Sequence, residues 1–417
     1  MKFFFADSLD YIDPGFDFER EEHSPDRQVQ RHDVYAHEYF TPPPYDGILV
    51  SRATVGDHRW QGKYSTAQSM RFRREGARAF LRYDLDKCNG AIMGDCGAFS
   101  YVNELEPIYT VPDMIEYYVE CGFTHAVSID HVILHYDESL DGPALFEDLV
   151  PGEWRRRYDL TLRLAREFHA ACQVQQVPFQ PIGVAQGWSP KSYALAVSRL
   201  VDIGFDYVAI GGLVPLRVNQ IHHVLEAVRE VEPSVRLHLF GFTKANDIQH
   251  FTQYNIESLD STSPLLRAFK DHTRNYLAPN DWYTAIRIPH ADESRLFKGQ
   301  ILEGRKQSRR LRDLEEASLR GLRSYAARTL SIEKTLEPLV EYGQEFNSRV
   351  HIDAYRHTLE DRPWEKCPCR VCSECGVEVI IFRGSNRNRR RGFHNLWEFH
   401  RQLQHLRNSQ KEPINAV

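Results

Sequence analysis

The chain has no long apolar run and no excess of basic residues. Nothing in its 417 residues approaches the about 18 uninterrupted apolar residues of a membrane-spanning helix. The apolar run in the opening Met-Lys-Phe-Phe-Phe-Ala is far shorter than the core of a secretion signal. The 52 Lys and Arg against 58 Asp and Glu give a net charge of −6, so the overall composition carries no signature of nucleic-acid binding. We therefore expect a protein of the cytoplasm without a membrane segment.

Two further patterns are missing. The eight cysteines are spread unevenly, with four between Cys367 and Cys375, which is not the framework of a secreted disulfide-rich protein and fits a reducing cytoplasm. The dinucleotide-binding glycine fingerprint is absent, because Ile210-Gly-Gly-Leu213 lacks its third glycine and acidic partner. No His-x-His follows the first predicted strand, as metal-dependent barrel hydrolases would require.

What is present is an alternation of short apolar runs and helical patterns, which indicates parallel strands joined by helices. Seven runs read as strands, and Tyr283–Pro289 is a possible eighth, so we predict an α/β protein with a (β/α)8 TIM-type barrel rather than a doubly wound sheet. The seven runs are Gly47–Val55, Ala91–Phe99, Thr124–Ile133, Val177–Gln186, Tyr207–Leu213, Arg236–Phe242 and Ile256–Ser263.

The composition changes along the chain and divides it into four predicted parts. Residues 1–45 form an N-terminal extension, and residues 46–290 form the barrel. Residues 291–360 form a helical insertion, with helices over Glu303–Ala327 and Ser331–Phe346. Residues 361–417 form a small zinc-binding subdomain that ends in a closing helix over Phe393–Leu406.

Polar residues follow several of the predicted strands, where a barrel keeps its active site. Asp95, Asp130 and Asp260 each end an apolar run, and Gln186 ends another. Carboxylates at one rim without a histidine-rich metal site favour glycosidic chemistry. For Asp95 alone, the simpler reading is a cap of the following turn. For His125 and His131, which flank Asp130, a functional role and a packing role stay equally open.

The order of four short motifs resembles the tRNA-guanine transglycosylase family, whose barrel enzymes exchange guanine for a 7-deazaguanine. The N-terminal segment 5–18, Phe-Ala-Asp-Ser-Leu-Asp-Tyr-Ile-Asp-Pro-Gly-Phe-Asp-Phe, and the following Glu-Glu-His-Ser-Pro are similar, more narrowly, to the DNA-modifying 7-deazaguanine transglycosylase branch called DpdA. The motifs are Gly94-Asp-Cys-Gly-Ala-Phe99, Val184-Ala-Gln-Gly187, Ile210-Gly-Gly-Leu213 and Leu259-Asp-Ser-Thr-Ser-Pro264.

The resemblance implies a role for each matched residue. Asp260 is the expected nucleophile on the sugar, and Asp95 the expected acid and base for the departing and incoming bases. Asp130 would accept hydrogen bonds from the amino edge of guanine, while Gln186 and the Gly212–Leu213 backbone would donate hydrogen bonds to its O6. Phe99 and Phe240 would enclose the ring, unless they are ordinary core residues.

The cysteine cluster resembles the zinc motif of the same family. Cys367-Pro-Cys369-Arg-Val-Cys372, with His394 further on, implies a closed structural Zn²⁺ site. Cys375 could replace His394 as a ligand, and His400 lies on the same predicted helix.

Three departures from tRNA enzymes bear on the substrate, and the first two favour DNA. The chain between nucleophile and cysteines is lengthened by the helical insertion, and Leu-Leu-Arg267 stands where those enzymes read tRNA. Arg217 stands where queuosine-type enzymes carry a glutamate, which favours the neutral base preQ0. We expect DNA that is single-stranded or locally opened, with an accessory protein as a possible partner. The alternatives are exchange on tRNA and a silent zinc-containing nucleic-acid-binding subunit. The residues predicted to hold phosphates are Arg267, Arg383, Arg387, Arg389, Arg390 and Arg391, with further arginines at 305, 309, 310 and 312.

Overall fold

The structure is a computed structural model that describes residues 1–83, 90–141, 149–242, 245–291, 308–345 and 350–411. The chain forms two compact units. The first unit comprises Met1–Leu9, Thr41–Ser263 and Leu403–Val417, and the second comprises Asp10–Phe40 and Pro264–Gln402. None of the helices that the structure describes combines enough length with enough apolar character to cross a lipid bilayer.

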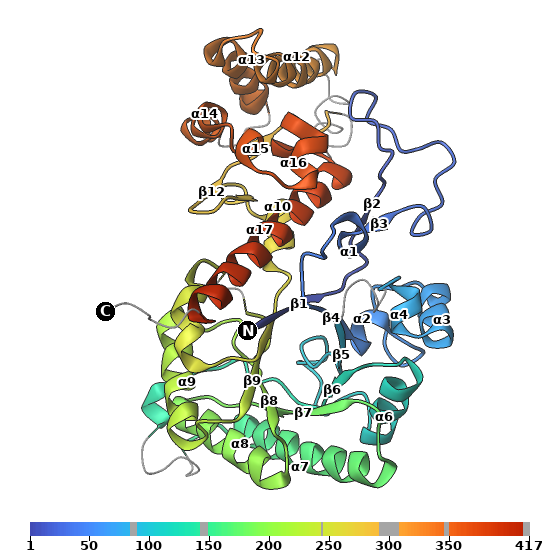
Figure 1. The fold of residues 1–417 in the computed structure, drawn as a ribbon, viewed down its shortest axis with the longest axis vertical. Coiled ribbons are helices and arrows are strands. Elements are labelled where there is room, and N and C mark those ends of the chain that lie inside the picture. The colour runs from blue at the N-terminus through green and yellow to red at the C-terminus, as the bar shows by residue number, and fades with distance from the viewer. Residues whose placement is uncertain (84–89, 142–148, 243–244, 292–307, 346–349, 412–417) are drawn as a thin grey trace. The chain divides into compact units, whose positions relative to one another are not determined.

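The first unit is a closed barrel of eight parallel strands, as the alternation predicted (Figure 1). Around the barrel the strands run in the order β1, β10, β9, β8, β7, β6, β5, β4, and β4 pairs again with β1. The strands are β1 (Lys2–Ala6), β4 (Gly47–Ser51), β5 (Ala91–Asp95), β6 (His125–Val127), β7 (Gln180–Ala185), β8 (Tyr207–Ile210), β9 (Arg236–Leu239) and β10 (Ser258–Asp260).

The interior of the barrel is filled by apolar side chains from these strands, so it is a packed core rather than a pore. The buried cluster consists of Phe4, Leu49, Met93, Val127, Ile182, Val184, Tyr207 and Ala209. Outside the strands lie α2 (Arg52–Val55), α3 (Thr66–Glu75), α4 (Ala77–Phe80), α6 (Val111–Glu120), η1 (Glu138–Leu140), α7 (Gly152–Gln175), α8 (Pro190–Ile203), α9 (Val218–Val231) and η2 (Ala245–Tyr254).

Local sequence explains where the crossover helices begin and end. Helix α8 starts at the N-cap Ser189, whose side chain accepts a hydrogen bond from the Ser192 amide, and Pro190 occupies its first turn. It ends at Gly204 in the left-handed conformation. Helix α6 begins in the same way, at Thr110. These ends hold the helices to lengths that return the chain to the next parallel strand.

Two predictions about the barrel strands are wrong. The predicted N-terminal extension contains the first barrel strand, because the buried Phe3, Phe4 and Phe5 form β1 between β10 and β4. The predicted eighth strand at Tyr283–Pro289 lies in the second unit, where the chain forms two short strands outside the barrel. The barrel is therefore closed by residues near the start of the chain, and the long central segment of its unit ends at Ser263 rather than residue 290.

The second unit is mostly helical. The two helices predicted for the insertion are present as α12 and α13, while residues 292–307 and 346–349 lie outside the described residues. Its strands are β2 (Tyr11–Ile12), β3 (Val34–Tyr35), β11 (Tyr276–Leu277), β12 (Trp282–Tyr283), β13 (Ile286–Arg287) and β14 (Ile381–Phe382). Its helices are α1 (Ala36–Tyr39), α12 (Ser308–Ala326), α13 (Ile332–Glu345), α14 (Ile352–Asp361), α15 (Pro363–Lys366), α16 (Arg370–Cys375) and η3 (Gly376–Ile380). Helices α10 (Ser263–Lys270) and α17 (Ser385–Lys411) each have residues in both units.

Candidate active site

A cavity of about 320 Å³ lies at the carboxyl ends of the barrel strands. This volume is at the lower end of the roughly 300–1,000 Å³ of small-ligand sites. The sequence-predicted residues that line it are Asp95, Phe99, Asp130, Gln186, Gly212, Phe240 and Asp260. Leu213 is buried and does not line the cavity. Closure of the barrel thus brings together strand ends that are up to 165 positions apart, from Asp95 to Asp260 (260 − 95).

Asp95 ends β5 with its carboxyl group facing this cavity. Burial, together with the nearby charge of Asp130, raises the pKa of Asp95 to about 7. Hydrogen bonds from the Gly97 backbone and the Ser51 side chain oppose that rise without cancelling it. A carboxyl group with a pKa near neutrality can both donate and accept a proton under ordinary conditions.

Asp130 is held at the cavity by two side-chain donors. Gln186 Nε2 donates to Asp130 Oδ2 at 2.6 Å, and Cys96 Sγ donates to Asp130 Oδ1 at 3.3 Å. Burial raises the pKa of Asp130 to about 6, although both hydrogen bonds act to lower it. Burial also raises the pKa of the Cys96 thiol well above its usual value, so the sulfur keeps the proton that it donates. The Tyr101 hydroxyl donates in turn to Cys96 at 3.0 Å.

Gln186 is itself fixed in place. Its Oε1 accepts a hydrogen bond from the Ile133 amide at 3.2 Å. A Cβ at Gly211 would lie 2.2 Å from Gln186 Nε2, and Gly212 has φ +72°. The glycine pair is therefore required both for space beside the amide and for a left-handed backbone.

Asp260 ends β10, and one of its oxygens is held by two groups from β9 and the residues that follow it. The Gly241 amide donates to Asp260 Oδ1 at 2.9 Å, and His238 Nε2 lies 3.3 Å from the same oxygen. His238, Cys96 and Tyr101 were not singled out in the sequence. The available signal for His238 was a polar residue inside an otherwise apolar strand, Arg236-Leu-His-Leu-Phe240.

The two phenylalanines differ in exposure. Phe99 is 60% exposed at the cavity, so it is not an ordinary core residue. Phe240 packs partly against the barrel core, with its ring centroid 4.7 Å from that of His238. The histidines that flank Asp130 in sequence do not line the cavity. His125 lies at the start of β6. His131 is buried, and its Nε2 lies 2.9 Å from the Glu104 carbonyl oxygen.

The predicted basic segment is largely interior to the second unit. Arg383, Arg387, Arg390 and Arg391 are buried, so the prediction that they hold phosphates on an exposed segment is wrong. Arg387 pairs with Glu21 and Glu378 at 2.7 Å each, and Arg383 pairs with Glu21 and Glu315.

The remaining buried arginines bind the backbone instead of carboxylates. Arg391 donates to the Ala268, Val379 and Ile381 carbonyls, and burial lowers its pKa to about 9. Arg390 donates to the Asp13 carbonyl at 2.9 Å. The helical pattern of α17 turns these residues inward. Two of the predicted residues keep partial exposure: Arg389 lies over the Tyr11 ring, and Arg267 lies 4.6 Å from the Trp282 ring.

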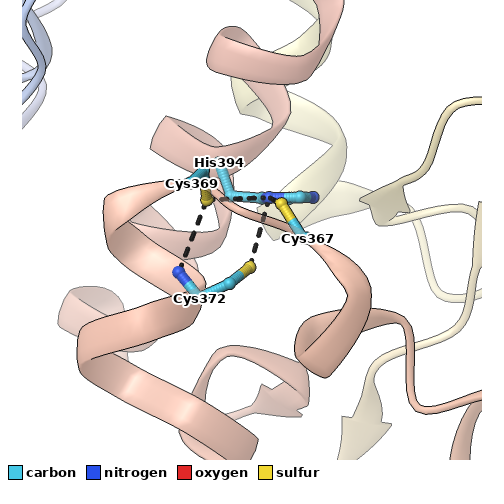
Figure 2. Close-up of side chains that lie close together, drawn as sticks. All are labelled: Cys367, Cys369, Cys372 and His394. Atoms are coloured by element: carbon cyan, nitrogen blue, oxygen red, sulfur yellow. Dashed lines mark hydrogen bonds between the residues drawn. The ribbon is translucent and has the colours of Figure 1, made fainter.

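Four side chains in the second unit form a group that could hold a metal ion. Figure 2 shows the side chains of Cys367, Cys369, Cys372 and His394 close together. Their possible ligand atoms all lie within 4.8 Å of one another. His394 Nδ1 lies 3.5 Å from Cys367 Sγ and 3.4 Å from the sulfurs of the other two cysteines. Tetrahedral bonding with Zn–S near 2.3 Å and Zn–N near 2.1 Å requires an S–N separation of about 3.6 Å, so the group fits Zn²⁺.

Neighbouring groups orient these ligands. His394 Nε2 lies 2.7 Å from the Leu277 carbonyl, which leaves Nδ1 for a metal, and the Tyr276 hydroxyl lies 3.1 Å from Cys372 Sγ. Cys375 is not part of the group, and its sulfur lies 3.7 Å from Arg390 Nη1. His400 is not part of the group either.

Comparison with known proteins finds sequence similarity along nearly the whole chain to one kind of enzyme and along about a third of the chain to another. The chain is 41% identical over 413 residues to a DNA-guanine transglycosylase of Salmonella montevideo, which covers 97% of both chains. It is 26% identical over 144 residues to a queuine tRNA-ribosyltransferase of Actinobacillus pleuropneumoniae, covering 34% of this chain and 36% of that protein. A queuine tRNA-ribosyltransferase of Thioalkalivibrio sulfidiphilus is 31% identical over 140 residues, 33% of this chain and 36% of that protein. No family model matches the chain.

Proposed function

This chain belongs to the DNA-guanine transglycosylase family, and from that premise we propose that it replaces guanine in DNA by a 7-deazaguanine base through a covalent bond between Asp260 and the sugar. Such an enzyme is a pentosyltransferase. The observation that carries the proposal is the meeting of Asp95, Asp130 and Asp260 at one cavity at the strand ends. A silent binding subunit would have no use for three carboxylates there, and each buried one carries a desolvation cost.

In the proposed reaction, Asp260 attacks C1′ of the target deoxyguanosine. The bond between its carboxylate oxygen and C1′ forms as the bond from C1′ to the guanine nitrogen breaks, and Asp95 gives its proton to the departing base. The incoming base then loses a proton to Asp95 and displaces Asp260 from C1′. Two displacements restore the original configuration of the sugar. A pKa near 7 suits Asp95 to both proton transfers.

Recognition of guanine follows from the donors and acceptors around the cavity. The Asp130 carboxylate accepts hydrogen bonds from the amino edge of the base. Gln186 uses one amide hydrogen on Asp130 and has a second for O6, beside the Gly212 amide. Adenine presents the opposite pattern and would leave these buried groups unpaired. Phe99 and Phe240 line the cavity where they could contact the two faces of the ring.

The incoming base in this proposal is preQ0. Arg217 is exposed and forms the N-cap of α9, at the end of the turn that follows Gly212. An arginine at this place disfavours a cationic aminomethyl base and accepts a neutral nitrile. The metal of the Cys3His group is Zn²⁺ in a structural role, because four protein ligands leave no open position for catalysis. The proposed site of action is the cytoplasm, because the cysteine pattern is not the framework of a secreted disulfide-rich protein.

The DNA is single-stranded or locally opened in this proposal, since flipping a base from a duplex costs roughly a few kcal/mol. An accessory protein that opens the duplex is one way to meet that cost. The buried arginines of α17 cannot contact phosphates in this conformation, so the basic residues left for DNA are partly exposed ones such as Arg267 and Arg389.

The test is incorporation of labelled preQ0 into purified single-stranded DNA, duplex DNA and tRNA under identical conditions, with Asp260→Asn as the blank. The expected result is label in DNA, most in single strands, and none in tRNA. Label in tRNA alone would replace the proposal by the tRNA reaction. No label in any substrate, together with binding of DNA, would favour the silent subunit.

A further inference from the structure

A buried chain of hydrogen bonds runs from Asp260 into the interior of the barrel. His238 Nε2 lies 3.3 Å from Asp260 Oδ1, and His238 Nδ1 lies 2.6 Å from Ser258 Oγ. Ser258 Oγ in turn lies 2.5 Å from the Tyr207 hydroxyl. His238 and Ser258 have no exposed surface, and Tyr207 is part of the barrel core.

The strand register explains why these residues meet. His238 in β9 and Ser258 in β10 are direct partners across the parallel pair. Asp260 lies two residues after Ser258, and alternate residues of a strand face the same side of a sheet. Ser258 and Asp260 therefore both face inward, one below the other, and the imidazole of His238 spans the distance between them.

The direction of these hydrogen bonds is determined by the carboxylate at one end. An unprotonated ring nitrogen would repel Asp260 Oδ1, so Nε2 carries the hydrogen and donates it. Nδ1 can then accept from the Ser258 hydroxyl, whose oxygen accepts from Tyr207. Burial raises the pKa of Tyr207 well above its ordinary value, so its hydroxyl keeps its proton at neutral pH. Each donor in the chain has an acceptor, which is the condition for a stable buried network.

The result is that Asp260 Oδ1 has two donors, His238 Nε2 and the Gly241 amide. The described residues supply no hydrogen-bond partner for Oδ2, and Asp260 lines the cavity. One oxygen is thus held in place, and the other oxygen of this cavity-lining side chain is left without a hydrogen-bond partner among the described residues.

We propose that His238 is a positioning residue for Asp260: supported by Ser258 and Tyr207, it holds Oδ1 so that Oδ2 is the oxygen that attacks C1′. This inference rests on the proposed function, in which Asp260 is the nucleophile. A well-oriented nucleophile removes much of the entropic barrier to attack, and a misplacement of about 1 Å can cost roughly a hundredfold in rate.

The experiment compares His238→Phe, which keeps a ring and removes both hydrogen bonds, with His238→Gln, whose amide can restore the donor to Asp260. His125→Phe is the matched control. The ring of His125 also packs near Phe4 in the barrel interior, 6.2 Å between centroids against 6.0 Å for His238. Its Nδ1 lies 2.9 Å from Thr124 Oγ1 instead of contacting Asp260, and His125 does not line the cavity. The measurements are the single-turnover rate of the covalent DNA adduct, the KM for DNA and the melting temperature.

We expect His238→Phe to slow adduct formation by at least about tenfold with KM little changed, as expected for loss of preorganisation. His238→Gln should recover most of that rate, and His125→Phe should retain it. An unchanged adduct rate in His238→Phe would overturn the inference, as would equal slowing in Phe and Gln variants that matches their loss of melting temperature. Absence of any adduct in the unmodified protein would instead refute the proposed function.

Discussion

Replacement of Asp95 by asparagine should make the protein more stable at pH 8 while it abolishes base exchange. The pKa of Asp95 is raised from its ordinary 3.8 to about 7, first by burial and then by the charge of Asp130. The folded protein therefore binds this proton more tightly than the unfolded chain does. The stability associated with the proton is fully present below pH 3.8 and is lost as the pH rises through about 7.

The magnitude follows from the size of the shift. Each pKa unit corresponds to about 1.4 kcal/mol, and the shift is 7 − 3.8 = 3.2 units. The ionised Asp95 side chain therefore lowers the free energy of unfolding by about 4 kcal/mol at pH 8. At pH 5 the side chain is still protonated in the folded protein but already ionised in the unfolded chain. This difference lowers the free energy of unfolding by about 2 kcal/mol. Asparagine has no charge to bury. The stabilisation by Asp95→Asn should therefore grow by about 2.5 kcal/mol between pH 5 and pH 8.

The assay is urea denaturation of the unmodified protein and of Asp95→Asn at both pH values. The matched control is Asp113→Asn, because hydrogen bonding to Arg59 holds the pKa of Asp113 well below its usual range. That carboxylate is ionised in both states at pH 5 and pH 8, so the effect of its replacement should not depend on pH in this window. A difference for Asp95→Asn that is the same at both pH values, or that shrinks toward pH 8, would refute the reasoning.

Three further predictions concern the nucleophile, the metal group and the buried ion pairs. Asp260→Asn should yield no covalent DNA adduct on a denaturing gel, because an amide is a poor nucleophile; an undiminished adduct would remove it from that role. Cys367→Ser should lose bound zinc by metal analysis and lower the melting temperature, whereas Cys375→Ser should keep the metal; the reverse pattern would contradict the ligand set. Arg387→Ala should cost about 3 kcal/mol in urea unfolding, because Glu21 and Glu378 both lose a buried partner and keep only Arg383 and Arg323 respectively. Arg389→Ala, which is half-buried, should cost much less, and equal losses would argue against the ion pairs.

The local pattern of the chain was enough to predict a barrel and its seven later strands. A short apolar run followed by a helical pattern specifies a strand and its crossover without reference to distant residues. The same pattern places Asp95, Asp130 and Asp260 directly after strands, and parallel strands in a closed barrel end at one rim. The convergence of these carboxylates follows from chain order and strand direction alone.

Other features depended on partners far away in the chain. The strand Lys2–Ala6 is defined by its pairing with Ser258–Asp260. Its own five residues do not indicate which segment it pairs with. The arginines of α17 were expected to hold phosphates, yet Arg387 pairs with Glu21, 366 positions away in the chain. A charged side chain can be buried only where a partner offsets its desolvation, and only the folded chain brings that partner.

Within the site, the sequence by itself indicated most of the groups that reach the cavity, because the end of a strand fixes the rim at which each side chain lies; Leu213 is the exception. Only the tertiary structure decided how those groups are held. The contact of His238 with Asp260 depends on the register between β9 and β10, and the raised pKa of Asp95 depends on what buries it. Register and burial are properties of packed neighbours, so they exist only once the barrel has closed.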